Sequence, residues 1–421
     1  MRRLASSLVG LLLAVAGCKD TSPPGCRIAQ STTLPASPLT LTSEVTVQRA
    51  GAGLVLVGAA GDDIRWAPLG LDGTLGTEST LTLPQRLAKP APVFATTGKS
   101  APGDQLVVAF VAPKAGAANQ FQILAITQMP GGAAAAPVPL ADLPPGVDPN
   151  IVRLAMGPSQ TGQRAVLAWA FEGQDAPPSL VLLQADGQPA GMPAPVVAMN
   201  IPRGSCLQVM PSRGDFAVSI TEGGAAGLPS IWRTFERNDD GKRPVNVEIH
   251  LDHVNVGCIS AAPTPRGYVL AYQNNDGTYF SDFNIDKGTI NSDIVAGVLQ
   301  FGGAAKQPKV ACIAPMGSEY SLLFDRVTGP EVWRFNAFGD PQGASLFLPS
   351  SAGQIGPLSA LPGKDTFHAT YLDQGRGSTG GNPSGNTRYL VRVDCPMATP
   401  FVSPDAAAPA GADAAAGEAG K

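Results

Sequence analysis

Short apolar runs of strand length recur along the chain at a nearly constant interval. Each run is about five residues long and follows turn-forming residues, as at 106–110 and 165–169. Bounded apolar runs of this length are typical of buried β-strands rather than of helices, whose apolar positions recur every three to four residues. Seven such runs lie about 50 residues apart, at 54–57, 106–110, 165–169, 216–220, 268–272, 320–324 and 367–371. The spacing predicts a repeated β unit.

Three further apolar segments accompany each run, so each unit contains four strands. One precedes the run, as at 152–155, and two follow it, often separated by turns such as Asp72-Gly73 and Asp186-Gly187. Four short strands per unit, repeated without helical periodicity, are typical of a β-propeller, in which each unit forms one blade. We therefore predict an all-β propeller of seven four-stranded blades over residues 35–397. No WD or kelch signature is present, so no family function transfers residue by residue.

The seventh unit lacks a fourth strand. It stops after residues 389–393, whereas residues 38–42 precede the first unit and have no unit of their own. An N-terminal strand that completes the last blade would close the ring and remove its exposed ends. We therefore predict that residues 38–42 pair with residues 389–393, and that a disulfide joins Cys26 to Cys395, which lie just outside these two segments.

The remaining cysteines offer a second disulfide. Cys206 and Cys258 each stand ten residues before the aromatic residue that opens a second strand, so they occupy equivalent positions in adjacent units. They form the second candidate pair, and Cys312 is the alternative partner for Cys258. Five cysteines besides Cys18 leave at least one unpaired in a monomer. An oxidising compartment favours disulfides over zinc, and no CxxC pair is present.

The N-terminus reads as an export signal. Met1-Arg2-Arg3 precedes an apolar stretch at 8–15, followed by Ala16-Gly17-Cys18. This segment resembles the lipobox of bacterial lipoproteins. The resemblance implies that residues 1–17 are a signal peptide, that Cys18 carries acyl chains such as palmitate, and that residues 18–34 are a lipidated tether. An export signal with an incidental cysteine is the alternative.

The expected location is the cell envelope. No later apolar run approaches the ~20 residues that a spanning helix needs, so the lipid on Cys18 would be the membrane anchor. An aspartate directly after the lipidated cysteine would resemble an inner-membrane retention signal. This position holds Lys19 instead, which favours the outer membrane or the cell surface.

Composition agrees with many short strands and excludes one class of partner. Glycine (49) and proline (40) exceed a fifth of the 421 residues, as expected where turns join strands. Charged residues make up 15% and the net charge is −4, so the concentrated basic face of a nucleic-acid-binding protein is not expected. Residues 398–421, rich in Ala, Pro and Gly, form an expected disordered tail.

Few residues offer catalytic chemistry. The three histidines are His250, His253 and His368. The first two have HxxH spacing, but they follow an expected strand at 245–249 and not a helix, so we predict no metal site. His368 lies in an alternating strand and is expected to be hydrogen-bonded. No HExxH, GxSxG, Walker, Rossmann or EF-hand pattern is present. We predict no cofactor and assign no catalytic residue.

Carboxylates are the one plausible catalytic set, because glycoside hydrolysis needs two of them on facing elements. The candidates are Asp276, Asp282, Glu319, Asp325, Asp365 and Asp373. Arginines accompany the third strands at Arg65, Arg233, Arg334 and Arg392. They give a faint similarity to the arginine cluster of sialidases, but the Ser-x-Asp-x-Gly-x-x-Trp turn motif of that family is absent.

The predicted function is a membrane-anchored binding or scaffolding module for an envelope protein or a glycan. The alternatives are a carbohydrate-active enzyme that uses rim carboxylates and a purely structural envelope lipoprotein. A cleft with converging carboxylates would favour the enzyme. An exposed apolar patch would favour protein binding.

Overall fold

The computed structural model describes an all-β protein built of small sheets. Described are residues 25–42, 45–50, 53–87, 89–98, 105–117, 119–159, 162–174, 176–196, 206–212, 215–222, 230–238, 245–251, 259–264, 267–273, 278–284, 289–290, 309–311, 319–326, 329–336, 344–350, 358–362, 366–374 and 386–395. Within these residues the strands form seven four-stranded antiparallel sheets. The predicted propeller fold with four-stranded blades is confirmed.

Each sheet takes its strands from one stretch of chain, except the last. Sheet 1 contains β2 (Val45–Ala50), β3 (Gly53–Ala60), β4 (Asp63–Leu69) and β5 (Ser79–Thr82). Sheet 2 contains β6 (Val93–Thr97), β7 (Gln105–Pro113), β8 (Phe121–Gln128) and β9 (Val138–Asp142). Sheet 3 contains β10 (Val152–Pro158), β11 (Ala165–Phe171), β12 (Ser179–Leu183) and β13 (Ala194–Pro195), preceded by the short 3-10 helix η1 (Pro149–Ile151). Sheet 4 contains β14 (Cys206–Pro211), β15 (Asp215–Glu222), β16 (Ser230–Asn238) and β17 (Val245–Leu251). Sheet 5 contains β18 (Ser260–Thr264), β19 (Gly267–Gln273), β20 (Thr278–Asn284) and β21 (Thr289–Ile290). Sheet 6 contains β22 (Lys309–Ala311), β23 (Glu319–Arg326), β24 (Gly329–Asn336) and β25 (Leu346–Phe347). Sheet 7 contains β26 (Ser359–Pro362), β27 (Thr366–Asp373), β28 (Thr387–Asp394) and β1 (Arg27–Thr33).

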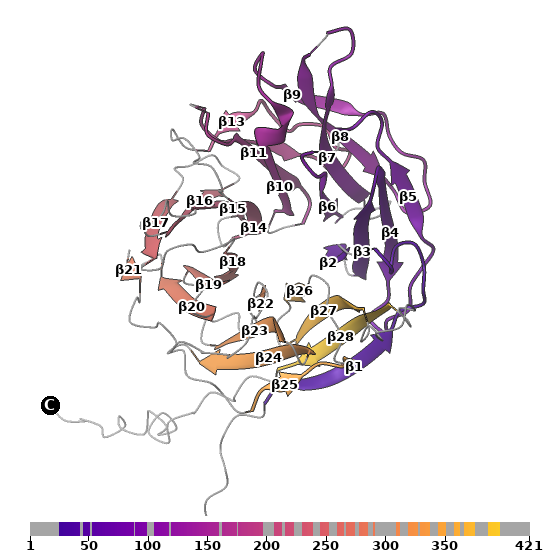
Figure 1. Cartoon of the computed structure of the whole chain (residues 1–421), viewed down its shortest axis with the longest axis vertical. Coiled ribbons are helices and arrows are strands. Elements are labelled where there is room, and N and C mark those ends of the chain that lie inside the picture. The colour runs from indigo at the N-terminus through magenta and orange to yellow at the C-terminus, as the bar shows by residue number, and fades with distance from the viewer. Residues whose placement is uncertain are drawn as a thin grey trace, which may run out of the picture.

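The sheets are arranged around a ring. The first strands of sheets 1 to 7 touch one another in chain order, and β26 of sheet 7 returns to touch β2 of sheet 1. Figure 1 shows the first strands on the inside of the ring and the later strands of each sheet toward the outside. The indigo N-terminal strand β1 lies beside the yellow C-terminal strand β28 (Figure 1).

The core lies between neighbouring sheets, and this explains the continuous apolar runs. All seven residues of β11 are buried. One face of β11, with Leu167 and Trp169, packs against sheet 2, and the other, with Val166 and Ala168, packs against sheet 4. A strand covered on both faces has no solvent side, so its sequence does not alternate. Burial of each large apolar side chain contributes about 1.5–3 kcal/mol.

A strand from the N-terminus completes the last sheet, but it is not the predicted one. β1 pairs antiparallel with β28, from Arg27 opposite Asp394 to Thr33 opposite Tyr389. The expected strand at 38–42 is wrong, and so is a tether that extends to residue 34. Residues 37–42 form a turn instead, in which the Ser37 amide donates to Thr40 Oγ1 and the Thr40 amide donates to Ser37 Oγ. The prolines at 35 and 38 have no N–H for a strand ladder.

This turn is nevertheless held against sheet 7. Arg388, at the start of β28, is 1% exposed. Its Nε donates to the carbonyl of Thr40 at 2.8 Å and its Nη2 donates to the carbonyl of Thr42 at 2.5 Å. Burial lowers the pKa of this guanidinium to about 10. Residues 38–42 are therefore held to sheet 7 by the Arg388 side chain, and not by the backbone pairing with residues 389–393 that the sequence predicts.

Side chains from neighbouring sheets cap the free edges of inner strands. Ser359 Oγ accepts from the amide of Val47, and Gln48 Oε1 accepts from the amide of Thr96. Gln208 Nε2 donates to the carbonyl of Ile259. Because buried backbone groups need partners, these bonds stabilise the ring where no further strand can pair.

Several predicted features lie outside the described residues. These are the signal peptide and Cys18, the tail at 398–421, and His253. Within the described ranges, no helix has the length and apolar character needed to cross a membrane.

Candidate binding surface

The carboxylate candidates within the described residues lie on three different strands, β20, β23 and β27. Asp325 and Asp373 lie near the ends of β23 and β27, the second strands of adjacent sheets. The side chain of Asp373 is buried, with 2% exposure. Asp282 lies within β20, and Glu319 begins β23 at the end opposite Asp325. Asp276 and Asp365 lie outside the described residues.

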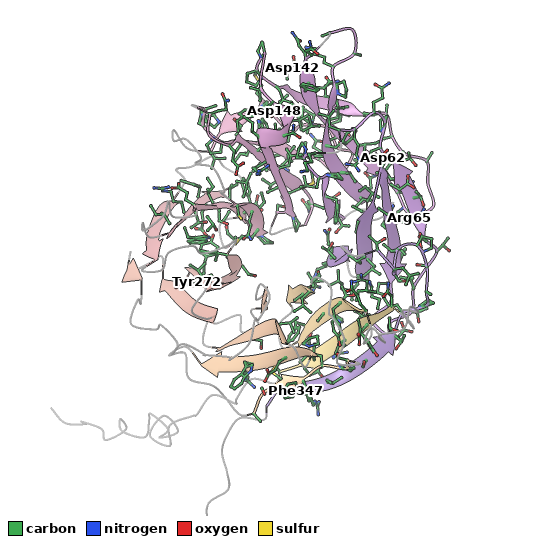
Figure 2. All side chains as sticks on the ribbon, viewed as in Figure 1. Asp62, Arg65, Asp142, Asp148, Tyr272 and Phe347 are labelled. Carbon is green, nitrogen blue, oxygen red and sulfur yellow. A yellow bond between two sulfur atoms is a disulfide. The ribbon has the colours of Figure 1, made fainter. Side chains whose placement is uncertain are left out.

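The third-strand arginines are engaged within their own sheets. Arg65 pairs with Glu78 at 2.9 Å and Arg392 pairs with Asp394 at 3.1 Å. Arg233 forms an ion pair with Glu222 of the neighbouring strand. Arg334 is buried, with 3% exposure. Figure 2 shows Arg65 at the outside of the ring, whereas Arg233, Arg334 and Arg392 belong to sheets 4, 6 and 7. Carboxylates of the same sheet therefore neutralise three of the four arginines.

His368 differs from the expectation. It lies in β27 and is 8% exposed, but its Nε2 has no hydrogen-bond partner within the described part of the chain. Burial lowers its pKa, as do the nearby charges of Arg392 and Arg49, whereas Asp394 raises it. The imidazole is therefore held neutral. At Nε2 the expected hydrogen bond is not formed among the described residues.

No metal-binding arrangement is found within these ranges. His250 extends the predicted strand at 245–249, since β17 runs to Leu251 and places His250 opposite Ile231. Among the described residues, no group of three or more His, Cys, Asp or Glu side chains could hold a metal ion.

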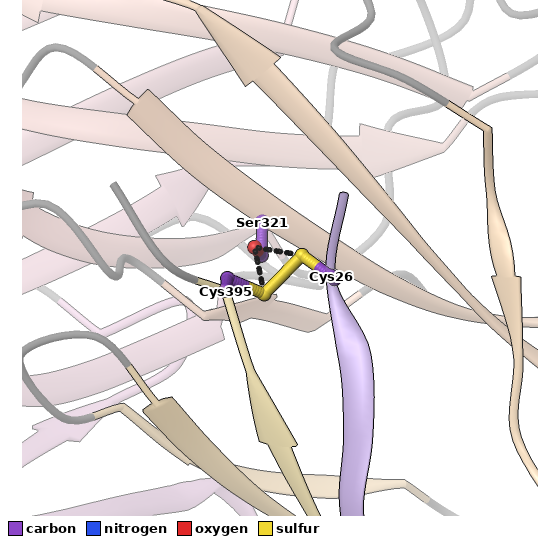
Figure 3. Close-up of a disulfide and its surroundings, with 3 residues drawn as sticks. All are labelled: Cys26, Ser321 and Cys395. Atoms are coloured by element: carbon purple, nitrogen blue, oxygen red, sulfur yellow. Dashed lines mark hydrogen bonds between the residues drawn. A yellow bond between two sulfur atoms is a disulfide. The ribbon is translucent and has the colours of Figure 1, made fainter. Parts of the chain in front are cut away.

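The N- and C-terminal cysteines are joined. Cys26 and Cys395 form a disulfide across 369 residues of sequence (Figure 3). Ser321 Oγ of β23 lies 3.6 Å from Cys395 Sγ and 3.9 Å from Cys26 Sγ. The bonded sulfurs carry no hydrogen, so the hydroxyl is the donor. The disulfide thus sits at the junction of sheets 6 and 7.

A third cysteine is also oxidised. Cys206 is disulfide-bonded. Its expected partner Cys258, like Cys312, lies outside the described residues.

The Asp-Gly turns between third and fourth strands reach back to the preceding sheet. Asp72 Oδ1 accepts from the Thr74 amide at 3.0 Å, and this bond lowers the pKa of Asp72. Gly73 has φ +83°, and a Cβ there would lie 2.6 Å from Thr32 Oγ1 of β1. In the same way, a Cβ on Gly187, at φ +78°, would lie 2.7 Å from Thr127 Cγ2 of sheet 2. Only glycine fits the conformation and the space.

A cleft of about 380 Å³ lies between the turns of sheets 1 and 2. Its lining residues are mostly apolar: Gly53, Leu54, Val55, Pro68, Leu69, Gly70, Thr74, Gly76 and Pro130. None of them titrates. Beside it on the turn of sheet 1, Leu71 is 54% exposed. The cleft can bury apolar groups but contains no acid, base or nucleophile. The sequence pattern did not reveal it, because residues of β3, β4 and the following turn of sheet 1 meet Pro130 of sheet 2 only in the folded chain.

The other exposed apolar side chains are scattered. Leu41 is 44% exposed in the turn at 37–42, Met192 is 90% exposed on a turn of sheet 3, and Phe347 is 53% exposed in β25 at the periphery (Figure 2). Single exposed apolar residues are normal on soluble surfaces. The cleft beside Leu71 is therefore the strongest candidate site within the described ranges.

Comparisons with known proteins support the fold alone. No protein-family model matches the sequence, and no curated protein does. A solved puromycin hydrolase S511A mutant complexed with PGG is similar at TM-score 0.51 and 13% identity, covering 81% of this chain and 53% of that one. The chain spans about half the length of that enzyme.

Two further solved structures are similar at lower scores. The β-propeller domain of the Trilobed protease from Pyrococcus furiosus has TM-score 0.43 and 8% identity, with 86% of this chain and 98% of that one covered. The PQQ-bound aldose sugar dehydrogenase from Streptomyces coelicolor has TM-score 0.42 and 13% identity, with 89% and 99% covered.

Proposed function

We propose that this chain is a lipid-anchored extracytoplasmic protein whose propeller is a binding or scaffolding module for an envelope protein or a glycan, with a protein partner favoured. The observation that carries the proposal is the apolar cleft between the turns of sheets 1 and 2, which has no titratable side chain. Its volume is within the ~300–1,000 Å³ typical of ligand sites.

The chemistry of the cleft favours binding over hydrolysis. A glycosidase needs two carboxylates about 5 to 10 Å apart in one cleft, and the lining of this cleft contains none. Glycan binding is also less suited to it, because no aromatic ring or charged group lines the cleft to stack on or hydrogen-bond a sugar. Exposed Pro68, Pro130 and Leu71 instead offer apolar contacts to side chains of a protein.

We further infer that the seven sheets are the seven blades of one closed ring. The contacts between first strands, which run in chain order and return from β26 to β2, support this number. A closed ring is a rigid support, and its turns are free to vary without loss of the core.

The binding site is tested by placing charge in the cleft. Pro130→Asp should reduce recovery of crosslinked envelope partners by at least about ten-fold, because a carboxylate in an apolar contact is costly to desolvate. Met192→Asp is the matched control, since it places the same charge on an exposed turn of sheet 3. Quantitative mass spectrometry of both eluates gives the measurement. Equal recovery from the two variants would contradict the proposed site.

The anchor has its own test. Cys18→Ser should abolish incorporation of labelled palmitate and release the protein from the outer-membrane or cell-surface fraction, because the acyl chains on Cys18 supply the membrane affinity. Fractionation and palmitate labelling of wild type and variant give the measurement. Wild-type protein without label would overturn the lipoprotein proposal.

The alternative is a carbohydrate-active enzyme that uses rim carboxylates. Turnover of an envelope polysaccharide by the purified wild type, lost in Asp373→Asn or Asp325→Asn without loss of fold, would favour it over the binding module.

A further inference from the structure

The chain enters the ring at one end of sheet 7. Cys26 is joined to Cys395, so the start of β1 and the end of β28 share this end. Only residues 19–25 separate Cys26 from Cys18. An extended chain spans at most about 3.6 Å per residue, so Cys26 can lie no more than ~29 Å from the lipidated residue.

Three arginines gather at this end. Arg27 Nη2 lies 3.9 Å from Asp394 Oδ2, and the Arg27 side chain is 75% exposed. Arg392 Nε donates to the other oxygen of Asp394 at 3.1 Å. Arg49, next to the last residue of β2, is exposed and has no ion-pair partner among the described residues. Asp394 therefore pairs with two of these three guanidinium groups.

The buried histidine does not compensate this charge. His368 is paired with Arg392 across the strands and responds to the charges of both Arg49 and Arg392. Its imidazole is neutral, and its buried Nε2 is unpartnered within the described ranges. In the adjoining sequence, Lys19 and Asp20 cancel, as do Lys364 and Asp365. Asp72, in the turn after β4, is a second carboxylate at this end. Three arginines against Asp394 and Asp72 leave this end of sheets 7 and 1 with a net charge of +1.

We propose that this end of the propeller faces the membrane, and that Arg27, Arg49 and Arg392 contact the phosphate groups of lipid headgroups. The inference rests on the lipid anchor proposed above. β28 is eight residues long, so the opposite end of sheet 7 lies roughly 26 Å away at ~3.3 Å per residue. If that opposite end faced the membrane, the tether would have to be almost fully extended. With the arginine end toward the membrane, the tether need not be extended. The cationic groups then come within the ~10 Å Debye length of the acidic surface.

Hydrogen exchange of the lipidated protein tests the orientation. In vesicles of phosphatidylglycerol and phosphatidylcholine, amides at residues 27–28, 49–50 and 392–395 should exchange more slowly than in detergent. Amides at 60–63, at the other end of sheet 1, should not change. Protection at both ends, at neither end, or only at 60–63 would overturn the inference.

A charge variant tests the headgroup contact. Arg27→Gln combined with Arg49→Gln should reduce the vesicle-specific protection about five-fold for each arginine, from the ~1 kcal/mol that one basic side chain contributes near an acidic surface. Lys114→Gln, in the turn after β7 at the opposite end, is the matched control. Thermal melting should show both variants folded. Undiminished protection in the double variant would overturn the role of the arginines.

Two further measurements show whether a negative result contradicts the membrane contact or the lipoprotein proposal. Inorganic phosphate added in detergent at constant ionic strength should not reproduce the protection. If it does, the arginines form a site for a free anion and the membrane contact is wrong. Mass spectrometry of the starting protein establishes whether Cys18 is acylated. An unacylated Cys18 overturns the lipoprotein proposal itself, whereas an acylated protein without oriented protection overturns this inference alone.

Discussion

His368 illustrates how a single residue can be placed correctly by its pattern and still be misjudged in its chemistry. The alternating strand was predicted, and His368 lies in β27. Its neighbours come from other strands and another sheet, Arg392 in β28 and Arg49 in β2. Sequence periodicity cannot show which charges meet at an interface between repeats, so the missing hydrogen bond could not be anticipated.

This residue gives a pH prediction. The pKa of His368 is lowered in the folded protein, so the unfolded chain takes up a proton first as pH falls through its ordinary value of 6.5. Stability that is present above this value is therefore lost toward acid pH. In His368→Gln, the free energy of unfolding in urea should fall less than in wild type between about pH 7 and about pH 5. Parallel pH profiles for the two proteins would show that the fold does not perturb this imidazole.

At the scale of elements, the turns of sheets 1 and 3 do more than reverse the chain. Sequence analysis assigned Asp72 and Asp186 to turns, and their side chains accept hydrogen bonds from the amides two residues on. The glycines that follow pack against the preceding sheet. Each turn therefore couples two repeats as well as two strands.

The coupling is tested by adding one methyl group. Gly187→Ala forces a side chain into positive φ and against Thr127, and it should lower the free energy of unfolding by about 1–3 kcal/mol. Gly191→Ala is the control, because nothing lies within 4 Å of its Cβ position, and it should change stability by less than ~0.5 kcal/mol. Thr127→Ser removes the clashing methyl and should recover part of the loss. If the two alanine variants melt alike, the turn does not press on sheet 2.

The strands differ in how far the sequence could predict them. Second strands such as β11 are buried on both faces and leave continuous apolar runs that are easily recognised. The closing strand β1 has at most intermediate burial at every residue, and its sequence RIAQSTT carries almost no apolar signal. Residues 38–42 alternate more clearly and misled the prediction. An edge strand is defined by its partner β28 and not by its own composition, so pattern alone could not find it.

On the scale of the whole molecule, the ring is completed only when the first and last strands meet. β1 and β28 pair along their length, and Cys26–Cys395 fixes one end of the pair. Arg388 holds the chain that leaves β1 at the other end. The disulfide sits against Ser321 of sheet 6, so the closure is tied to the neighbouring sheet as well. The sequence predicted closure and this cysteine pair, but not the arginine.

Removal of the disulfide measures the contribution of closure. Replacing Cys26 and Cys395 together by serine should lower the free energy of unfolding by up to about 4–5 kcal/mol, because the bond restricts a very long loop in the unfolded chain. Ser321→Ala keeps the bond, removes only its neighbouring hydroxyl and should cost about 1 kcal/mol. The measurement is urea unfolding under non-reducing conditions. A double variant as stable as Ser321→Ala would mean that strand pairing alone closes the ring.

The position of this disulfide also decides how the protein bears a mechanical load. A pull on the N-terminus reaches Cys26 before it reaches β1. Without the covalent link, such a force would break the hydrogen bonds between β1 and β28 one after another, starting at Arg27 and Asp394. With the link, the tension passes from Cys26 through sulfur into Cys395 and bypasses the β1 ladder. The pairing of β1 with β28 is thereby shielded from force applied at the N-terminus.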